Sequence, residues 1–347
     1  METFWFMAVA FMITMYVLLD GFDLGAGAIH PFVARNDDER RMVLLAIGPV
    51  WDGNEVWIIA AGGTLFFTFP QLYASSFSGF YLPLIIVLWL LMIRGLSIEL
   101  RGHVDSPLWG SFWDGAFFLG SALLAIFYGA ALGNVVRGVP IGEDNYFFQP
   151  LWTNFSPTSP DPGILDWYTV LIGLLALLTL VVHGANFIAV KTEHELNARA
   201  RYIVRFSWIA TILLTALATV ATFYYLRPEM LSNFAERPWG VVLPVLALGG
   251  LAGVGYFNFK GQDRAAFLSS STYILGMMTS TALAIYPSVL PAVNPENSLT
   301  IYNASASRYG LVFGLVWWSI GMGLAAVYFI LIYRLFRGKV RMEDEGY

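Results

Sequence analysis

Two carboxylic acids and an amide lie in a part of the chain that is otherwise apolar enough to cross a membrane. Asp52, Asn54 and Glu55 fall within the apolar stretch 42–69. The segment around them reads Gly48-Pro49-Val50-Trp51-Asp52-Gly53-Asn54-Glu55-Val56-Trp57. An ionised side chain at membrane depth costs about 3 kcal/mol on insertion scales, and such residues often mark proton or ion routes. We predict a protonatable site here; a polar stripe that joins two helices and a ligand contact are the alternatives.

The spacing of these residues places them on one side of a helix. Gly48, Asp52 and Glu55 fall at positions i, i+4 and i+7, which share one stripe. Glycines allow a neighbouring backbone to approach, so we expect the first two spans to pack closely. The residues expected to serve in helix packing are Gly21, Gly25, Gly48, Gly53, Trp51 and Trp57.

A second pair of acids lies near the end of the first apolar segment. Asp20 and Asp23 are three residues apart, so they are neighbours on one flank of a helix. If this helix continues to Val33, Asp23 lies about 15 Å from its cytoplasmic end, a depth that matches that of Asp52. The acids would then form one hydrophilic line. The alternative is that they cap a shorter helix at the interface.

One basic residue is placed to balance these acids. Arg94 lies near the end of the third apolar segment, deeper than Arg101. Pairing with Asp23 or Asp52 would make both charges tolerable inside the membrane. Arg101 is expected to be an anchor at the inner edge of the membrane.

The histidines give little support for a metal or haem site. Of His30, His103, His183 and His194, only His183 lies clearly within an apolar segment, beside a glycine. A haem can use an axial histidine, but a lone histidine in such a setting is more often a hydrogen-bonded packing residue. The chain has no cysteine. We therefore predict that it ligates no metal.

The composition identifies the class of protein. The chain has 347 residues, of which 57% are hydrophobic and 12% are charged, whereas soluble domains carry about 25% charged residues. This is too little polar surface for a soluble protein, so we predict an all-α polytopic membrane protein forming one integral membrane domain over 1–347. No nucleic-acid partner is expected.

The apolar segments predict about nine membrane-spanning helices arranged in bundles. They are helices because an isolated strand cannot satisfy its backbone hydrogen bonds in lipid. The expected spans are 3–23, 42–69, 78–98, 113–134, 165–190, 203–226, 238–258, 266–290 and 309–333.

The distribution of basic residues predicts the orientation. With nine spans and the N-terminus outside, 15 of the 19 Lys and Arg residues fall in or beside inner loops. The four remaining basic residues, on the outside, are Arg137, Arg227, Arg237 and Arg308. Because cytoplasmic loops carry an excess of Lys and Arg, this asymmetry predicts an outer N-terminus and an inner C-terminus.

Three stretches of the sequence are characteristic of one family. The first is Leu19-Asp20-Gly21-Phe22-Asp23-Leu24-Gly25, the second is Arg35-Asn36-Asp37-Asp38-Glu39-Arg40-Arg41, and the third is the ten-residue segment from Gly48 to Trp57. Together they resemble subunit II of the cytochrome bd-type quinol oxidases, a family that includes cyanide-insensitive members. Length and span number agree, so the resemblance extends over essentially the whole chain.

The resemblance implies a partner and a place for the chemistry. In this family a separate subunit I carries two b-type haems and haem d and oxidises quinol, and subunit II normally ligates no haem. Protons for reduction of O2 to water come from the cytoplasm. A small single-helix subunit, a bound quinone and membrane lipid are further expected partners, and the bacterial cytoplasmic (inner) membrane is the expected location.

The resemblance also implies roles for single residues. Asp52 matches the family's channel acid, Asp23 the first-helix acid near the haem pair, and Arg94 the third-helix arginine. The proton path predicted from residues and resemblance together comprises Asp52, Asp23, Asp20, Glu55 and Asn54, with Arg94 as charge partner. A stand-alone proton-coupled transporter and a structural scaffold are the competing functions.

Overall fold

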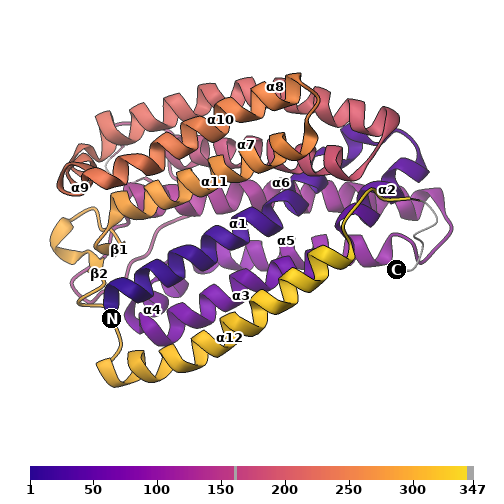
Figure 1. Cartoon of the computed structure of the whole chain (residues 1–347). Helices are drawn as coiled ribbons and strands as arrows, with labels where there is room; N and C mark the ends of the chain where they lie inside the picture. Colours follow the sequence, from indigo (N-terminus) through magenta and orange to yellow (C-terminus); the bar gives the residue numbers. More distant parts are fainter. Residues whose placement is uncertain (160–161, 342–347) are drawn as a thin grey trace.

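The computed structural model describes residues 1–159 and 162–341, and most of them are helical (Figure 1). The helices are α1 (Glu2–Val33), α2 (Asp37–Ile47), α3 (Trp51–Thr68), α4 (Pro70–Gly79), α5 (Tyr81–Leu100), α6 (Pro107–Arg137), α7 (Trp167–Lys191), α8 (His194–Val220), α9 (Leu231–Glu236), α10 (Val242–Phe259), α11 (Asp263–Ile285) and α12 (Arg308–Leu335). The long helices run along one common direction, as in a membrane bundle.

Every expected span overlaps a helix or a helix pair. Among the described residues, seven helices are individually long and apolar enough to cross a membrane, and the bent pair α2–α3 is an eighth candidate. The segment expected as the remaining span is α11, a 23-residue helix that packs against α10, α7 and α1. The start of α1 and the end of α12 lie at opposite ends of the bundle (Figure 1), as an odd number of crossings requires. We call the end with the basic loops the cytoplasmic end.

The second expected span is not one continuous helix. It consists of α2 and α3, which are bent by 46° at the break. Pro49 lies in this break, and a proline there cannot donate the next helical hydrogen bond. Gly48 therefore ends α2 while Asp52 lies in the first turn of α3. The predicted stripe that joins Gly48 to Asp52 and Glu55 on one helix is wrong.

The outer end contains ordered elements besides the long helices. The segment after α3 forms the short helix α4, which begins at Pro70, a residue pre-organised for a first helical position. The span expected to continue to 290 ends at Ile285, and the chain then forms strand β1 (Ser288–Leu290), which pairs antiparallel with β2 (Leu299–Thr300). Pro287 accounts for this early end, because helices usually stop before a proline.

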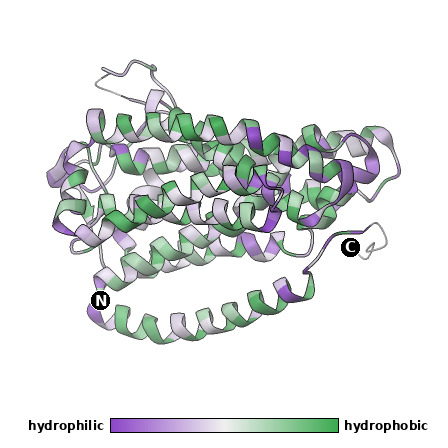
Figure 2. Ribbon diagram, turned by 45° about the horizontal axis from the view of Figure 1, so that its top comes forward, coloured by the Kyte–Doolittle hydropathy of each residue, from purple (hydrophilic) through white to green (hydrophobic). Residues whose placement is uncertain are grey.

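Helix α1 is the centre of the bundle. It contacts α3, α6, α7 and α11, and every residue from Asp20 to His30 is buried. Helix α12 is the opposite case, since Leu311 is its only buried residue. Figure 2 shows α12 along one edge, with apolar residues over most of its length and hydrophilic residues near its ends.

Close packing in the centre depends on glycines. The first two spans pack against each other as expected, through α1 and α3, but the glycines of α1 face other helices. A Cβ at Gly25 would overlap the backbone of Leu180 and Gly184 in α7, and a Cβ at Gly184 would overlap Gly25 in turn. Gly21 also faces α7, through Leu180 and His183. Gly21 and Gly25 therefore join α1 to α7, whereas Gly27 faces α6, where a Cβ would overlap Ser121.

Candidate functional site

A buried ion pair joins α1 to α5. The guanidinium of Arg94 donates from Nη1 to Oδ2 of Asp20 at 3.1 Å and from Nη2 to Oδ1 at 2.5 Å. Both side chains are fully buried. Gly120 of α6 leaves room for the stem of Arg94. Because an unpaired charge in this environment is very costly, each residue depends on the other. The predicted partners of Arg94 were Asp23 or Asp52, and the structure gives it Asp20 instead.

A second buried carboxylate lies one turn further along α1. The amide of Asn54 donates to Oδ2 of Asp23 at 2.7 Å, and the hydroxyl of Tyr333 in α12 donates to Oδ1 of Asn54 at 2.8 Å. Oδ1 of Asp23 is buried and has no hydrogen-bond partner among the described residues. Because α1 continues for ten residues beyond Asp23 to Val33, neither acid caps a helix end.

Glu55 and Asp52 complete the group on α3. A carboxylate oxygen of Glu55 lies 3.8 Å from Nη1 of Arg94, and its side chain is 20% exposed. Asp52 is exposed on the side of α3 that faces away from α1. Asn54 faces Asp23, and two residues of helix turn through about 200°, which is why Asp52 points away from α1. The structure thus places Asp52 at the depth of Asp23 without bringing the two acids together.

The exposed side of α3 forms a regular stripe. Its members are Asp52, Val56, Ile59, Gly63 and Phe66, all of them exposed. We call them the α3 stripe. A carboxylate at membrane depth is rarely left facing lipid, so another polypeptide is expected to cover this stripe.

The aromatic residues of the ten-residue segment pack around the charges. The guanidinium of Arg94 lies 6.0 Å from the ring centroid of Trp51, and Trp57 is buried against Phe329 of α12. Gly53 faces α12 as well, since a Cβ there would lie 2.7 Å from the hydroxyl of Tyr328.

His183 is fully buried, and both of its ring nitrogens are hydrogen-bonded. Nδ1 lies 2.7 Å from Oγ of Ser270, and Nε2 lies 2.9 Å from the carbonyl oxygen of Leu18. The ring stacks on Phe267 with the centroids 4.8 Å apart. This arrangement leaves no nitrogen free for a metal. The described residues also contain no group of three or more His, Cys, Asp or Glu side chains suited to a metal ion.

Sequence reasoning missed a second polar cluster at the cytoplasmic end. Asp114 accepts hydrogen bonds from Arg101 at 2.6 Å and from Arg40 at 3.0 Å, and it lies 2.8 Å from Nε2 of His30. Asp37 accepts a further bond from Arg101 at 2.7 Å. Of these residues, the sequence alone singles out only Arg101, as an anchor at the inner edge of the membrane.

A spacing signal for this cluster was present in the sequence. His30 follows Asp23 by seven residues, and Arg101 follows Arg94 by seven. Residues seven apart on a helix share one face, two turns apart.

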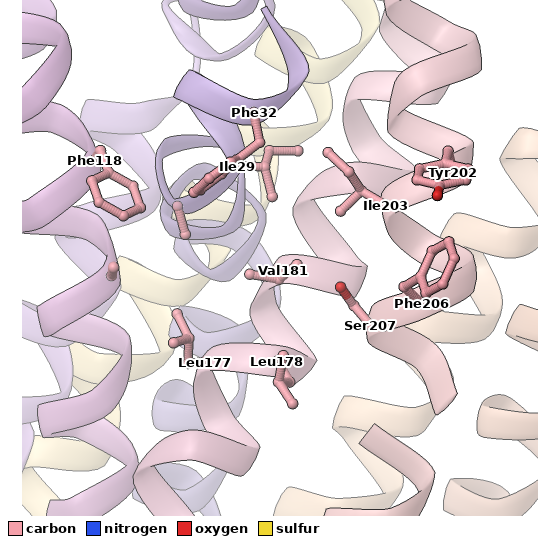
Figure 3. A pocket seen from close by; sticks show the side chains of 12 residues that line it. Ile29, Phe32, Phe118, Leu177, Leu178, Val181, Tyr202, Ile203, Phe206 and Ser207 are labelled. Atoms are coloured by element: carbon pink, nitrogen blue, oxygen red, sulfur yellow. The ribbon is translucent and has the colours of Figure 1, made fainter. Parts of the chain in front are cut away.

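An apolar groove opens on another side of the bundle (Figure 3). It has a volume of about 520 Å³ and lies between α1, α6, α7 and α8. Ile29 and Phe32 line one side, Phe118 a second and Phe206 a third, while Tyr202 and Ser207 carry the hydroxyl groups. The groove has no charged side chain in its lining and is separate from the buried acids.

The sequence is similar to a known family over almost its whole length. Residues 1–336 match the family model described as cytochrome bd terminal oxidase subunit II. The chain is 31% identical to the probable cytochrome oxidase subunit 2 of Haemophilus influenzae, over 97% of this chain and 94% of that protein. It is 30% identical to the cytochrome bd-I ubiquinol oxidase subunit 2 of Escherichia coli K12, over 98% and 95% respectively.

The fold also has a counterpart among solved structures. A chain of the bd oxidase from Geobacillus thermodenitrificans superimposes with a TM-score of 0.72, covering 96% of this chain and 98% of that one. The two are 17% identical in sequence, so the likeness concerns the fold alone.

Proposed function

The chain belongs to the family of cytochrome bd terminal oxidase subunit II, and from this we propose that its buried acids carry protons from the cytoplasmic side toward the haems of a partner subunit. It is a subunit of a quinol:oxygen oxidoreductase. The comparisons give no support to a stand-alone transporter.

Membership of this family implies a partner subunit I. We propose that subunit I carries two b-type haems and haem d, and that it oxidises quinol, in the bacterial inner membrane. The α3 stripe is the surface we assign to this contact, because covering it would remove Asp52 from lipid. A small single-helix subunit and surrounding lipid are expected on other faces.

The observation that carries the proton-transfer proposal is the buried oxygen Oδ1 of Asp23. Its neighbour Asp20 is committed to Arg94 through both oxygens, whereas Asp23 receives a donor on Oδ2 only. A carboxylate with one open oxygen accepts and releases a proton without breaking an ion pair. Glu55 is half-buried beside Arg94, and Asp52 lies on the α3 stripe. These two residues continue the series of acids from the interior to the surface proposed for the partner.

Asp23→Asn and Asp52→Asn test this proposal in the complete oxidase. Each variant keeps the shape of the side chain but removes the exchangeable acid. We expect turnover and cytoplasmic proton uptake to fall by about a hundredfold, the lower end of the range for loss of a general acid or base, with haem content retained. Glu193→Gln, on an exposed cytoplasmic turn, is the matched control. Full turnover and full membrane potential in both variants would leave these acids with a packing role only.

We propose the groove in Figure 3 as a binding site for an apolar chain from the membrane, either the tail of a quinone or a lipid acyl chain. The lining is almost wholly apolar, as either chain requires. Ala122→Phe would fill the groove from α6. Mass spectrometry of molecules extracted from the purified complex should then show less quinone or less lipid, and the species lost identifies the occupant. Unchanged amounts of quinone and lipid in the extract would exclude the groove as a binding site for either chain.

A further inference from the structure

Two basic residues at the cytoplasmic end of α8 and α10 are not neutralised by an acid. Arg205 lies on α8, and Lys260 directly follows the last residue of α10. Both residues are exposed, and neither forms an ion pair with an acid in the part of the chain that the structure describes. We call Arg205 and Lys260 the cation pair.

An ion pair one helical turn away holds the two helix ends together. Arg201, four residues before Arg205 on α8, donates from Nε and Nη2 to the carboxylate of Asp263 at 2.7 and 2.8 Å. Its Nη2 also lies 3.1 Å from the carbonyl oxygen of Gly261, which accepts a hydrogen bond. The turn after α10 is thereby fixed against α8. Asp263, the acid of this turn, is bound to Arg201 and leaves the charge of Lys260 unbalanced.

Aromatic rings and one amide orient the cation pair. Nε of Arg205 donates to Oδ1 of Asn258 at 3.3 Å, and Cζ lies 5.5 Å from the ring centroid of Phe259. The ammonium of Lys260 donates to the hydroxyl of Tyr256 and lies 4.3 Å from the centroid of that ring. A cation over an aromatic face is held in place and keeps its charge. Because Phe259 directly precedes Lys260, the two charges lie at one level.

The cation pair has hydrogen-bond donors that the chain does not use. Nη1 and Nη2 of Arg205 make no hydrogen bond to any described residue. Lys260 has three donors, of which the hydroxyl of Tyr256 takes one. The planar guanidinium binds two phosphate oxygens side by side, and an ammonium beside it adds a point charge. The unused donors are therefore of the kind that a phosphate group accepts.

Below the cation pair, toward the middle of the membrane, both helices expose apolar side chains. Ile209 and Leu213 of α8 are more than half exposed, and so are Val245 and Phe259 of α10. The acyl chains of a lipid whose phosphate lies at the cation pair would run along this surface.

The position of this surface favours lipid over the partner subunit as its occupant. Helices α8 and α10 lie along one edge of the bundle, and α3 and α12 lie along the opposite edge (Figure 1). The α3 stripe, which we assign to subunit I, is therefore remote from the cation pair. Basic residues at the cytoplasmic side of a membrane attract anionic lipid head groups, so charge complementarity identifies an anionic phospholipid.

We propose that the cation pair binds the phosphate group of an anionic phospholipid from the cytoplasmic leaflet. Because Arg205 and Lys260 come from different helices, the bound lipid joins α8 to α10. The site is separate from the groove in Figure 3, which lies between α8 and the helices α1, α6 and α7. It does not depend on the proton-transfer proposal.

The first test measures lipid binding to the complete oxidase by native mass spectrometry. The probes are phosphatidylglycerol, which is anionic, and phosphatidylcholine, which is zwitterionic, each added to delipidated complex in detergent. Arg205→Gln with Lys260→Gln should weaken the binding of one phosphatidylglycerol molecule about thirtyfold, equivalent to ~1 kcal/mol for each cation. Binding of phosphatidylcholine should not change, and the haem content reports whether the complex has assembled.

Arg334→Gln with Arg337→Gln is the matched control, because it removes two exposed basic residues at the same end of the molecule but on the opposite edge. It should leave this phosphatidylglycerol molecule bound. An equal loss in both double variants would show that net charge alone controls binding, and no loss in either would show that the cation pair holds no lipid; both results overturn the proposal. Displacement of the lipid by an equal concentration of inorganic phosphate would identify a site for free anions instead.

The second test needs no variant. Cryo-electron microscopy of the complete oxidase in nanodiscs of phosphatidylglycerol should show head-group density within hydrogen-bond distance of Nη1 or Nη2 of Arg205 and of Nζ of Lys260. A map that resolves lipids on other faces and shows none at the cation pair would overturn the proposal.

Discussion

Asn54 holds Asp23 by a single hydrogen bond of 2.7 Å to Oδ2 and is itself held by the hydroxyl of Tyr333 at 2.8 Å. The three residues come from α3, α1 and α12 respectively. The amide of Asn54 is thereby oriented with its nitrogen toward the acid. The hydrogen bond from Tyr333 also ties α12, most of whose residues are exposed or half-buried, to the centre of the bundle.

This relationship predicts a graded effect of two substitutions. Asn54→Leu removes the donor to a buried acid and should destabilise the complex by ~2 kcal/mol, whereas Tyr333→Phe removes a neutral hydrogen bond and should cost ~1 kcal/mol. Thermal or denaturant unfolding of the purified complex measures both. Tyr309→Phe, at the exposed outer end of α12, is the control. Equal stability of all three variants would contradict the arrangement.

Replacing only one residue of the Asp20–Arg94 ion pair should destabilise the complex more than replacing both residues. Asp20→Leu leaves a buried guanidinium without its bidentate partner, which typically costs 3–5 kcal/mol. We expect little assembled complex from this variant. Adding Arg94→Leu removes the stranded charge and should recover much of the yield, measured as haem-containing complex per membrane protein. No recovery in the double variant would show that the pair has a requirement beyond charge balance.

His183→Ala should lower the stability of the assembled complex without removing any haem absorption band. Both ring nitrogens are occupied within the chain, so the substitution leaves Ser270 and the carbonyl of Leu18 without their partner. We expect a stability loss of ~2 kcal/mol from the lost bonds and the cavity. The absorption spectrum of whatever complex remains should contain every haem band. Selective loss of one band from an assembled complex would identify His183 as a ligand.

Gly25→Leu should separate α1 from α7. The side chain would overlap the backbone of Leu180 and Gly184, and close helix contact in membranes depends on such small residues. Yield of assembled complex should fall severalfold. Gly249→Leu is the matched control, because a Cβ at Gly249 meets nothing within 4 Å. Similar yields from both variants would be inconsistent with the contact between Gly25 and Gly184.

The orientation predicts the outcome of reporter fusions. A reporter inserted at Glu193, in the turn between α7 and α8, should report a cytoplasmic position, because this turn is flanked by Lys191 and Arg199. A second reporter at Thr158 should report the outer side. Activity of the first reporter outside the membrane would reverse the topology and, with it, the side from which the buried acids are proposed to receive protons.

The sequence by itself determined the class of protein, the approximate spans and the family. These properties depend on apolar run length, on the distribution of Lys and Arg and on short motifs, all of which are local. It also identified Asp20, Asp23, Asn54, Glu55 and Arg94 as out of place in lipid, because a polar residue within an apolar run is visible in the sequence before its partner is known. Its errors were local as well: Pro49 divides a span that hydropathy alone reads as continuous.

Only the tertiary structure decided which polar groups meet. Arg94 binds Asp20 and not Asp23 or Asp52, because the rotation of α1 and α5 about their axes is set by packing across the whole bundle. The same rotation turns Gly25 toward α7 and Asp52 outward. His30, Arg101 and Asp114 belong to three different helices, and nothing in the sequence links them directly. They become one network because α1, α5 and α6 bring their cytoplasmic ends together, a contact that no single helix encodes.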